Sequence, residues 1–383
     1  MSAAGTGRTA ALTSLALTLM VGLAACGSKE RDGGAAPGGP GARTVEVALT
    51  DAGCEPAKLE LAAGAITFKV SNKGTDKVNE FEVTDGNRIL GEVENVTAGL
   101  ERSFSLDLES GNYLLQCPGG SSAARGTLTV TESAAARAAA DADLRAAAER
   151  YRRYVQQQTG LLVRTTRTFV EAVLARDVAA AKKAYAPARV PYERIEPVAE
   201  SFGSLDPAID AREGDVPAKE WGGFHRIEQA LWIRNTTLGM APVARELLAD
   251  VTELQQKVRG VRLDASQIAN GANELLGEVS SSKITGEEER YSRIDLLDFK
   301  ANLDGSRAAF DAVRPALDKR DSDLATEIQT RFEAADRALA PYRQASGYVP
   351  YNRLTDADTR KLSQAIDALA EPLSEVSAQL VAS

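Results

Sequence analysis

The sequence contains a single histidine, His225, among 383 residues, with three cysteines and three methionines. A chain with one imidazole cannot build a site that needs two histidine ligands. This excludes the His-Glu-x-x-His zinc peptidases and the carboxypeptidase type of zinc site. It also excludes a blue-copper centre, which takes two histidines, a cysteine and usually a methionine. Any metal chemistry of the chain must therefore use His225 and carboxylates.

Basic residues are also fewer than acidic residues. The chain has 45 Lys and Arg residues against 54 Asp and Glu residues, and its formal net charge is −9. An acidic chain without a basic, aromatic patch is not expected to bind nucleic acid. The acidic balance suits a protein that binds cations.

Long apolar runs are confined to the N-terminus, and none reaches membrane-spanning length. Arg8 precedes an uncharged, mostly apolar run over residues 10–22, and Leu23-Ala24-Ala25-Cys26-Gly27 follows. This layout predicts a secretory signal peptide over residues 1–25. Its end resembles a bacterial lipobox, in which Cys26 is lipidated, and the alternative is an ordinary signal peptide with an incidental cysteine. We expect a lipid-anchored protein on the extracytoplasmic face of the cell membrane, or a periplasmic protein if the lipobox is not used.

The Gly- and Pro-rich residues 26–42 are expected to form a flexible tether. Beyond it, residues 43–132 show apolar residues at every second position, as in Val45, Val47 and Leu49. Short alternating runs separated by Gly and Asn predict a small all-β sandwich.

An Ala-rich linker over residues 133–143 leads into a second half, residues 144–383, in which apolar residues recur every three to four positions. This period predicts an all-α helical bundle. The expected helices cover 144–176, 179–202, 220–233, 242–259, 265–282, 287–317, 322–345 and 356–380.

Acidic residues in the helical half recur at helical spacing. Glu193 and Glu196 are three residues apart, as are His225 and Glu228, and such pairs lie on one face of a helix. Asp210 lies between these pairs, and Glu288 opens a later segment. Each alone fits a solvated face, a helix cap or a structurally buried histidine. Their apolar surroundings favour some inward-facing carboxylates, whose repulsion a bound cation would offset.

The β-half holds Cys54 and Cys117. In an oxidising compartment an even pair predicts a disulfide. The alternative is a second, unconventional metal site formed by both cysteines with Glu55, Glu80 and Glu82. The segment Tyr113-Leu114-Leu115-Gln116-Cys117-Pro118-Gly119 resembles the last strands of a cupredoxin, but the domain lacks that family's histidine and methionine ligands.

Longer motifs carry a further resemblance. They are Ala186-Pro187-Ala188-Arg189-Val190-Pro191-Tyr192-Glu193-Arg194-Ile195-Glu196-Pro197, Ile209-Asp210-Ala211-Arg212-Glu213, Gly223-Phe224-His225-Arg226-Ile227-Glu228 and Lys283-Ile284-Thr285-Gly286-Glu287-Glu288. In these motifs the chain resembles the EfeO family of the bacterial EfeUOB iron-uptake system, over nearly all of the mature sequence.

The resemblance implies a cupredoxin-like domain followed by an imelysin-like helical domain. It also implies an iron-binding protein that works with a membrane iron permease and a haem-containing Dyp-type peroxidase. The metal ligands that it implies are Glu193, Glu196, Asp210, His225, Glu228 and Glu288. We therefore expect iron capture and delivery rather than catalysis. The two alternatives are a metal-dependent hydrolase of the imelysin peptidase type and a surface polysaccharide-binding module.

Overall fold

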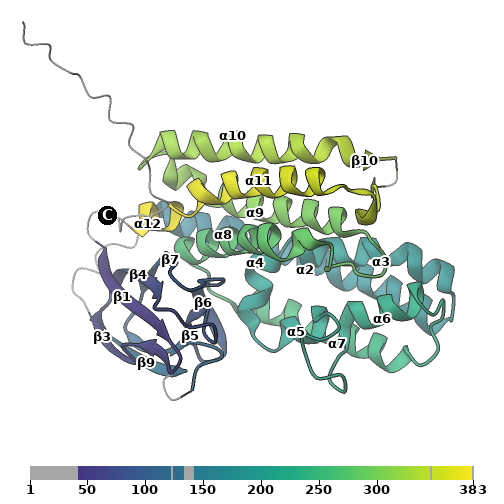
Figure 1. Cartoon of the computed structure of the whole chain (residues 1–383), viewed down its shortest axis with the longest axis horizontal. Coiled ribbons are helices and arrows are strands. Elements are labelled where there is room, and N and C mark those ends of the chain that lie inside the picture. The colour runs from purple at the N-terminus through teal and green to yellow at the C-terminus, as the bar shows by residue number, and fades with distance from the viewer. Residues whose placement is uncertain (1–41, 122–123, 133–141, 346, 382–383) are drawn as a thin grey trace, which may run out of the picture. The chain divides into compact units, whose positions relative to one another are not determined.

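The computed structural model describes residues 42–121, 124–132, 142–345 and 347–381. The signal peptide, the lipobox with Cys26, nearly all of the tether and most of the Ala-rich linker lie outside these residues and stay predictions. Within the described ranges, no helix combines the length and the apolar character needed to cross a membrane. The fold comprises a β-sandwich and a helical domain, which confirms the predicted class (Figure 1).

Two sheets form the sandwich. The strands are β1 (Arg43–Thr50), β2 (Gly53–Glu55), β3 (Lys58–Ala62), β4 (Gly64–Asn72), β5 (Phe81–Asp85), β6 (Arg88–Val93), β7 (Glu101–Leu108), β8 (Gly111–Gln116) and β9 (Arg125–Thr131). One sheet has the order β2-β1-β4-β7 and the other β3-β9-β8-β5-β6. The β1–β4 and β3–β9 pairs are parallel, and the remaining pairs are antiparallel.

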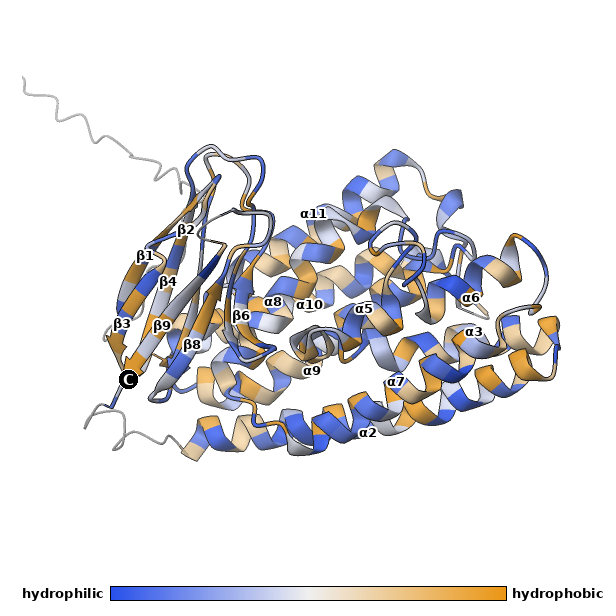
Figure 2. Ribbon diagram, turned by 90° about the horizontal axis from the view of Figure 1, so that it is seen from below, coloured by the Kyte–Doolittle hydropathy of each residue, from blue (hydrophilic) through white to orange (hydrophobic). Residues whose placement is uncertain are grey.

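The inward-facing side chains of both sheets form one apolar core. Phe68 on β4, Phe81 on β5 and Phe104 on β7 are buried, and their ring centroids lie 5.3–6.0 Å apart. Alternation of hydrophobic and hydrophilic residues is visible along the strands in Figure 2. The period of two seen in the sequence thus corresponds to one buried and one outward face of each sheet.

The helical domain is built from α2 (Ala142–Leu174), α3 (Val178–Glu193), α4 (Glu196–Ala199), α5 (Leu205–Asp210), α6 (Gly223–Trp232), α7 (Ala241–Gly260), α8 (Ala265–Ser281), α9 (Asp295–Leu317), α10 (Ser322–Leu339), α11 (Asp356–Leu373) and α12 (Val376–Val381). Short 3-10 turns occur at Glu200–Phe202, Lys283–Thr285, Ala340–Tyr342 and Tyr351–Arg353. A two-stranded ribbon, β10 (Arg343–Gln344) with β11 (Gly347–Tyr348), follows α10.

Two of the expected helices differ from the structure where the site is built. The helix expected over 179–202 is interrupted after Glu193 and resumes at Glu196. The helix expected to begin at residue 287 begins at Asp295 instead. Residues 286–294 cannot continue a helix because Gly286 and Arg293 both have left-handed backbone angles, with φ of 77° and 63°.

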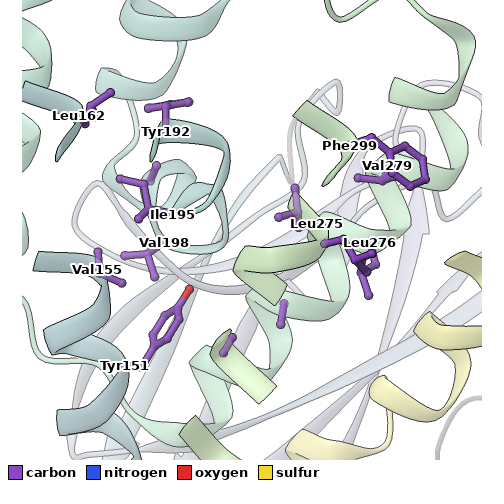
Figure 3. Close-up of a cluster of buried hydrophobic side chains, with 14 of the residues drawn as sticks. Tyr151, Val155, Leu162, Tyr192, Ile195, Val198, Leu275, Leu276, Val279 and Phe299 are labelled. Atoms are coloured by element: carbon purple, nitrogen blue, oxygen red, sulfur yellow. The ribbon is translucent and has the colours of Figure 1, made fainter. Parts of the chain in front are cut away.

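The segment with the interruption is anchored in the helical core. Tyr192, Ile195 and Val198 are buried in one apolar cluster with Tyr151 and Val155 of α2, and all five are drawn in Figure 3. Burying an apolar side chain of this size contributes about 1.5–3 kcal/mol. This packing fixes the backbone from which Glu193 and Glu196 project.

Candidate metal centre

Glu228 holds the only histidine in a fixed orientation. Both residues lie on α6 and are buried, and Glu228 Oε2 is 3.2 Å from His225 Nδ1. The other carboxylate oxygen, Oε1, accepts hydrogen bonds from the backbone N–H groups of Tyr291 (2.9 Å) and Ser292 (2.6 Å). The imidazole is therefore oriented with Nδ1 on Glu228 and Nε2 on the opposite side of the ring.

Gly223 allows α6 to begin directly against the end of α5. It has a φ of 65°, and a Cβ at this position would collide with the carbonyl oxygen of Ile209. This close approach places His225 Nε2 3.4 Å from Asp210 Oδ1 and 3.5 Å from Glu288 Oε1. Glycine is required here both for its backbone angle and for its missing side chain.

Three overlapping sets of side chains could each surround a metal ion. In each set the ligand atoms all lie within 4.8 Å of one another. The sets are Asp210–His225–Glu288, His225–Glu228–Glu289 and Glu193–Glu196–Asp210. The structure thus brings all six residues expected from the sequence into one buried centre, and it adds Glu289.

A buried arginine lies among these acids. Arg189 on α3 is fully buried, and its guanidinium forms ion pairs with Glu193, one helical turn later, and with Asp210. Further ion pairs join Arg189 to Glu289 (2.9 Å), Glu288 (3.3 Å) and Asp298 (3.3 Å). A guanidinium with its fixed fork of donors suits such a bridging position better than an ammonium does.

Lys283 neutralises the other end of the centre. Its ammonium contacts Glu196 and lies 3.6 Å from Glu193 Oε2. Asn302 on α9 donates to Glu193 Oε2 (2.9 Å) and to Glu196 Oε2 (2.6 Å). One turn later on α9, a Cβ on Gly305 would collide with the carbonyl oxygen of Arg194, so α9 passes tightly against the break between α3 and α4.

The imidazole is cationic before any metal binds. Burial and the nearby Arg189 lower the pKa of His225, but Glu228, Glu288 and Glu289 outweigh them and raise it to about 10. At neutral pH the ring therefore carries a proton on both nitrogens. A metal ion that binds Nε2 must displace one of these protons.

The carboxyl groups of the centre titrate very differently from one another. Burial opposes ionisation of Glu288, yet Lys283 and His225 hold its pKa well below the usual range. Burial raises the pKa of Glu196 well above its usual range, and it raises the pKa of Asp298 to about 7, with neighbouring carboxylates adding to both shifts. The acids outnumber the cationic groups, so part of the excess charge is held as protons.

A metal ion fits this donor set. His225 Nε2 is buried and makes no hydrogen bond within the described part of the chain. Buried polar atoms without a partner are rare in folded proteins and call for an explanation. One imidazole nitrogen with several carboxylate oxygens is a set that iron, manganese and zinc accept.

The cysteines of the β-sandwich are joined in the structure. Cys54 and Cys117 form a disulfide with a Cα–Cα distance of 5.8 Å. A disulfide sulfur is not a thiolate ligand, so a cysteine-based metal site at this end of the sandwich would first require reduction. Glu55, next to Cys54, is exposed and belongs to none of the candidate metal groups among the described residues.

Glu80 instead groups with two other acids. Its carboxylate, with those of Glu92 and Glu94, forms a set whose ligand atoms lie within 4.8 Å of one another. Glu82 faces Glu92 across the β5–β6 pair. Burial, with Glu82 beside it, raises the pKa of Glu80 to about 9. Glu80, Glu92 and Glu94 are only partly buried, unlike the acids of the helical centre.

Two known family models match the chain, one for the helical domain and one for the β-sandwich. The family model described as Imelysin matches residues 147–376, and the model described as Cupredoxin-like domain matches residues 15–130. Fold and site together define a protein class in which a cupredoxin-like sandwich precedes an imelysin-type helical domain with a buried centre of acids and one histidine.

The chain is 41% identical over 339 residues to the iron uptake system component EfeO of Yersinia pestis, covering 87% of this chain and 90% of the relative. It is 40% identical, with the same coverage, to EfeO of Escherichia coli strain K12. The chain belongs to the EfeO family. Among solved structures, it is similar to auracyanin A, a blue copper protein from Chloroflexus aurantiacus, at 16% identity and a TM-score of 0.22, covering 24% of this chain and 100% of that chain.

Four further members of the centre were not predicted as functional residues. They are Arg189, Lys283, Glu289 and Asp298. Arg189 and Lys283 stand inside the quoted family motifs, but as basic residues they do not suggest a metal centre. Glu289 sits in an acidic run that is typical of a helix N-terminus. Asp298 on α9 carries no local signal, and its place depends on tertiary packing.

Proposed function

We propose that this protein is an extracytoplasmic iron-binding component that captures iron in the helical centre and delivers it to a membrane iron permease. The observation that carries the proposal is His225 Nε2, which is buried without a hydrogen-bond partner in the described chain and faces Asp210 and Glu288. The relatives are named as components of an iron uptake system, and iron accepts this donor set.

Glu228 takes an orienting role in this proposal. Its carboxylate lies on Nδ1 and is held by two backbone N–H groups, so Nε2 points to the ion while Glu228 sets the tautomer and supports the ring. Asp210 and Glu288 supply oxygen ligands around the same point. The centre binds and releases its cargo, and no step of bond making is needed.

The geometry gives no support to peptide hydrolysis. A zinc peptidase holds its metal with two or more strong side-chain ligands and keeps a free carboxylate as general base. In this centre Glu228 already accepts hydrogen bonds from Tyr291 and Ser292 and contacts His225. Only one histidine exists in the sequence.

We also propose the location and the partners. A signal peptide over residues 1–25 and lipidation of Cys26 would anchor the chain to the outer face of the cell membrane, with residues 26–42 as tether. The permease and a Dyp-type haem peroxidase are the partners that the family resemblance implies. The net negative charge of the chain supports attraction of iron cations rather than of anionic ligands.

The test is iron binding by the purified chain without its signal peptide. Protein is loaded anaerobically with Fe²⁺, desalted, and analysed for metal by mass spectrometry. We expect His225→Ala to lower iron affinity at least 100-fold while circular dichroism stays unchanged. Glu80→Gln with Glu92→Gln is the matched control in the sandwich and should leave the helical site intact. Loss of iron in the control but not in His225→Ala would place the main site in the sandwich.

A further inference from the structure

The centre contains a second cation position, and the chain fills it with its own side chain. We propose that the Lys283 ammonium occupies the place of a second metal ion beside Glu193 and Glu196, and so limits the centre to one bound ion. The inference rests on the proposed function, because it assumes that the first ion binds at His225. It makes Lys283 a residue that sets metal stoichiometry.

The ammonium is positioned as a ligated cation would be. Lys283 Nζ contacts Glu196 Oε1 and lies 3.6 Å from Glu193 Oε2, and only 9% of its side chain is exposed. Lys283 comes from the 3-10 turn after α8, whereas the two acids flank the break between α3 and α4. Two segments that are far apart in the sequence therefore meet at this charge.

The two acids that contact Lys283 belong to a ligand set with Asp210. Oxygen atoms of Glu193, Glu196 and Asp210 lie within 4.8 Å of one another. Asp210 also belongs to the set with His225 and Glu288, so the two sets share one carboxylate. A carboxylate shared between two sets is the arrangement that holds paired metal ions in helical bundles.

Asn302 is a side chain that can turn an oxygen towards these two acids. Its side chain is fully buried, and its amide nitrogen donates to Glu193 and Glu196 while its Oδ1 makes no hydrogen bond within the described residues. A half-turn of the amide would direct this oxygen to the place where the nitrogen now lies. Oδ1 would then be a neutral oxygen ligand for a cation held by the two glutamates.

The charge balance explains why one built-in cation excludes an added one. Glu193 and Glu196 are both buried, and a buried carboxylate is costly to hold without a cation beside it. Lys283 provides that charge permanently. A divalent ion would have to displace the ammonium from Glu196 Oε1 and Glu193 Oε2. Removal of the ammonium leaves these two oxygens available, while Arg189 still pairs with Glu193 Oε1 and with Asp210.

Replacement of Lys283 tests the inference directly. Wild type, Lys283→Met and Lys283→Arg are titrated with Mn²⁺, and bound metal per chain is measured by equilibrium dialysis and mass spectrometry. We expect Lys283→Met to bind one equivalent more than wild type, and Lys283→Arg, which keeps the charge, to bind the same number. Any Mn²⁺ bound to the β-sandwich cancels in this difference.

Two further measurements define the position of the added ion. The extra equivalent should disappear when Glu196→Gln is combined with Lys283→Met. Electron paramagnetic resonance should show that the extra Mn²⁺ is magnetically coupled to the first ion, because the two sets share Asp210. If Lys283→Met failed to fold, Lys283→Gln would replace it, since glutamine removes the charge but keeps hydrogen-bonding atoms.

The results separate this inference from the proposed function. A folded Lys283→Met or Lys283→Gln protein with unchanged stoichiometry overturns the role of Lys283, as does an extra ion that is uncoupled or insensitive to Glu196→Gln. If His225→Ala, with Lys283 intact, binds metal as tightly as wild type, the proposed function is overturned instead. This holds for any result with the Lys283 variants.

Discussion

Arg189 allows the most demanding test of the electrostatics, through the change Arg189→Met. Its fully buried guanidinium forms ion pairs with Glu193, Asp210 and three further acids. Removing one partner of a buried ion pair destabilises a protein by about 3–5 kcal/mol, because the other charge stays buried and unpaired. In a domain of about 150–250 residues each kcal/mol lowers the melting temperature by roughly 2–4 °C. We therefore expect a fall of about 6–20 °C in chelator.

Metal should reverse part of this loss. A ligand at 100 times its dissociation constant stabilises a native protein by about 2.7 kcal/mol. Without the guanidinium, the ion meets less competing charge at Asp210 and Glu288, although Arg212 still pairs with Glu288 at 3.3 Å. Mn²⁺ should therefore raise the melting temperature of Arg189→Met by more than that of wild type. The melting temperature of Arg189→Lys in chelator should lie between those of Arg189→Met and wild type, because an ammonium cannot bridge all five acids.

The assay is thermal unfolding followed by circular dichroism, in chelator and in excess Mn²⁺. Arg194→Met is the matched control. Arg194 pairs with Asp304 at 3.3 Å on a partly exposed surface, and such pairs contribute at most about 1 kcal/mol. If Arg189→Met were as stable as wild type in chelator, the buried acids would not depend on Arg189 and our description of their charge balance would be wrong.

Three other outcomes follow from the same structure. Because the pKa of His225 is raised to about 10, metal binding at pH 7 should release a proton from this ring, and the metal affinity should rise up to about tenfold per pH unit towards pH 10. Calorimetry in buffers of different ionisation enthalpy measures both the affinity and the proton release. A pH-independent affinity would refute metal binding through this ring. The raised pKa also means that the protonated His225 ring stabilises the metal-free protein. This stabilisation is fully present below pH 6.5 and is lost as the pH rises through about 10. Gly223→Ala should lower the unfolding free energy by roughly 2 kcal/mol and weaken metal binding. The control Gly222→Ala, where an added Cβ meets only ordinary contacts, should lower it by less than about 1 kcal/mol. Equal effects of the two changes would contradict the close approach of Gly223 to Ile209. Changing both Cys54 and Cys117 to serine opens a loop with a sequence separation of 63 and should lower sandwich stability in urea by about 4 kcal/mol without affecting metal at His225.

The period of the apolar residues was enough to predict both domains, because burial of one face imposes a period of two on strands and about 3.6 on helices. Within the centre, the spacing of His225 and Glu228 predicted a shared helix face, and the structure places both on α6. Asp210 and Glu288 were noted as acids near these pairs, and the resemblance to a family added them to the predicted metal ligands. Their meeting with His225 depends on tertiary contacts such as that of Gly223 with Ile209, which no local pattern encodes.

The segment around Glu288 shows what local patterns miss. Three consecutive glutamates are typical of a helix start, and the helix was expected to begin there. The structure instead turns at Gly286 and Arg293, and the backbone N–H of Glu289 donates to Asp295 Oδ1. Partners elsewhere in the chain, including Arg189, override the local preference because a buried carboxylate needs a cation or a proton.

The central claim is that iron binds in the helical domain at His225 Nε2. The most direct measurement is an anomalous difference map from crystals of the iron-loaded protein, collected on both sides of the iron absorption edge. We predict that the strongest peak lies beside His225 Nε2, between Asp210 and Glu288. An absence of iron there, with the strongest peak at the Glu80, Glu92 and Glu94 carboxylates of the β-sandwich, would contradict the claim.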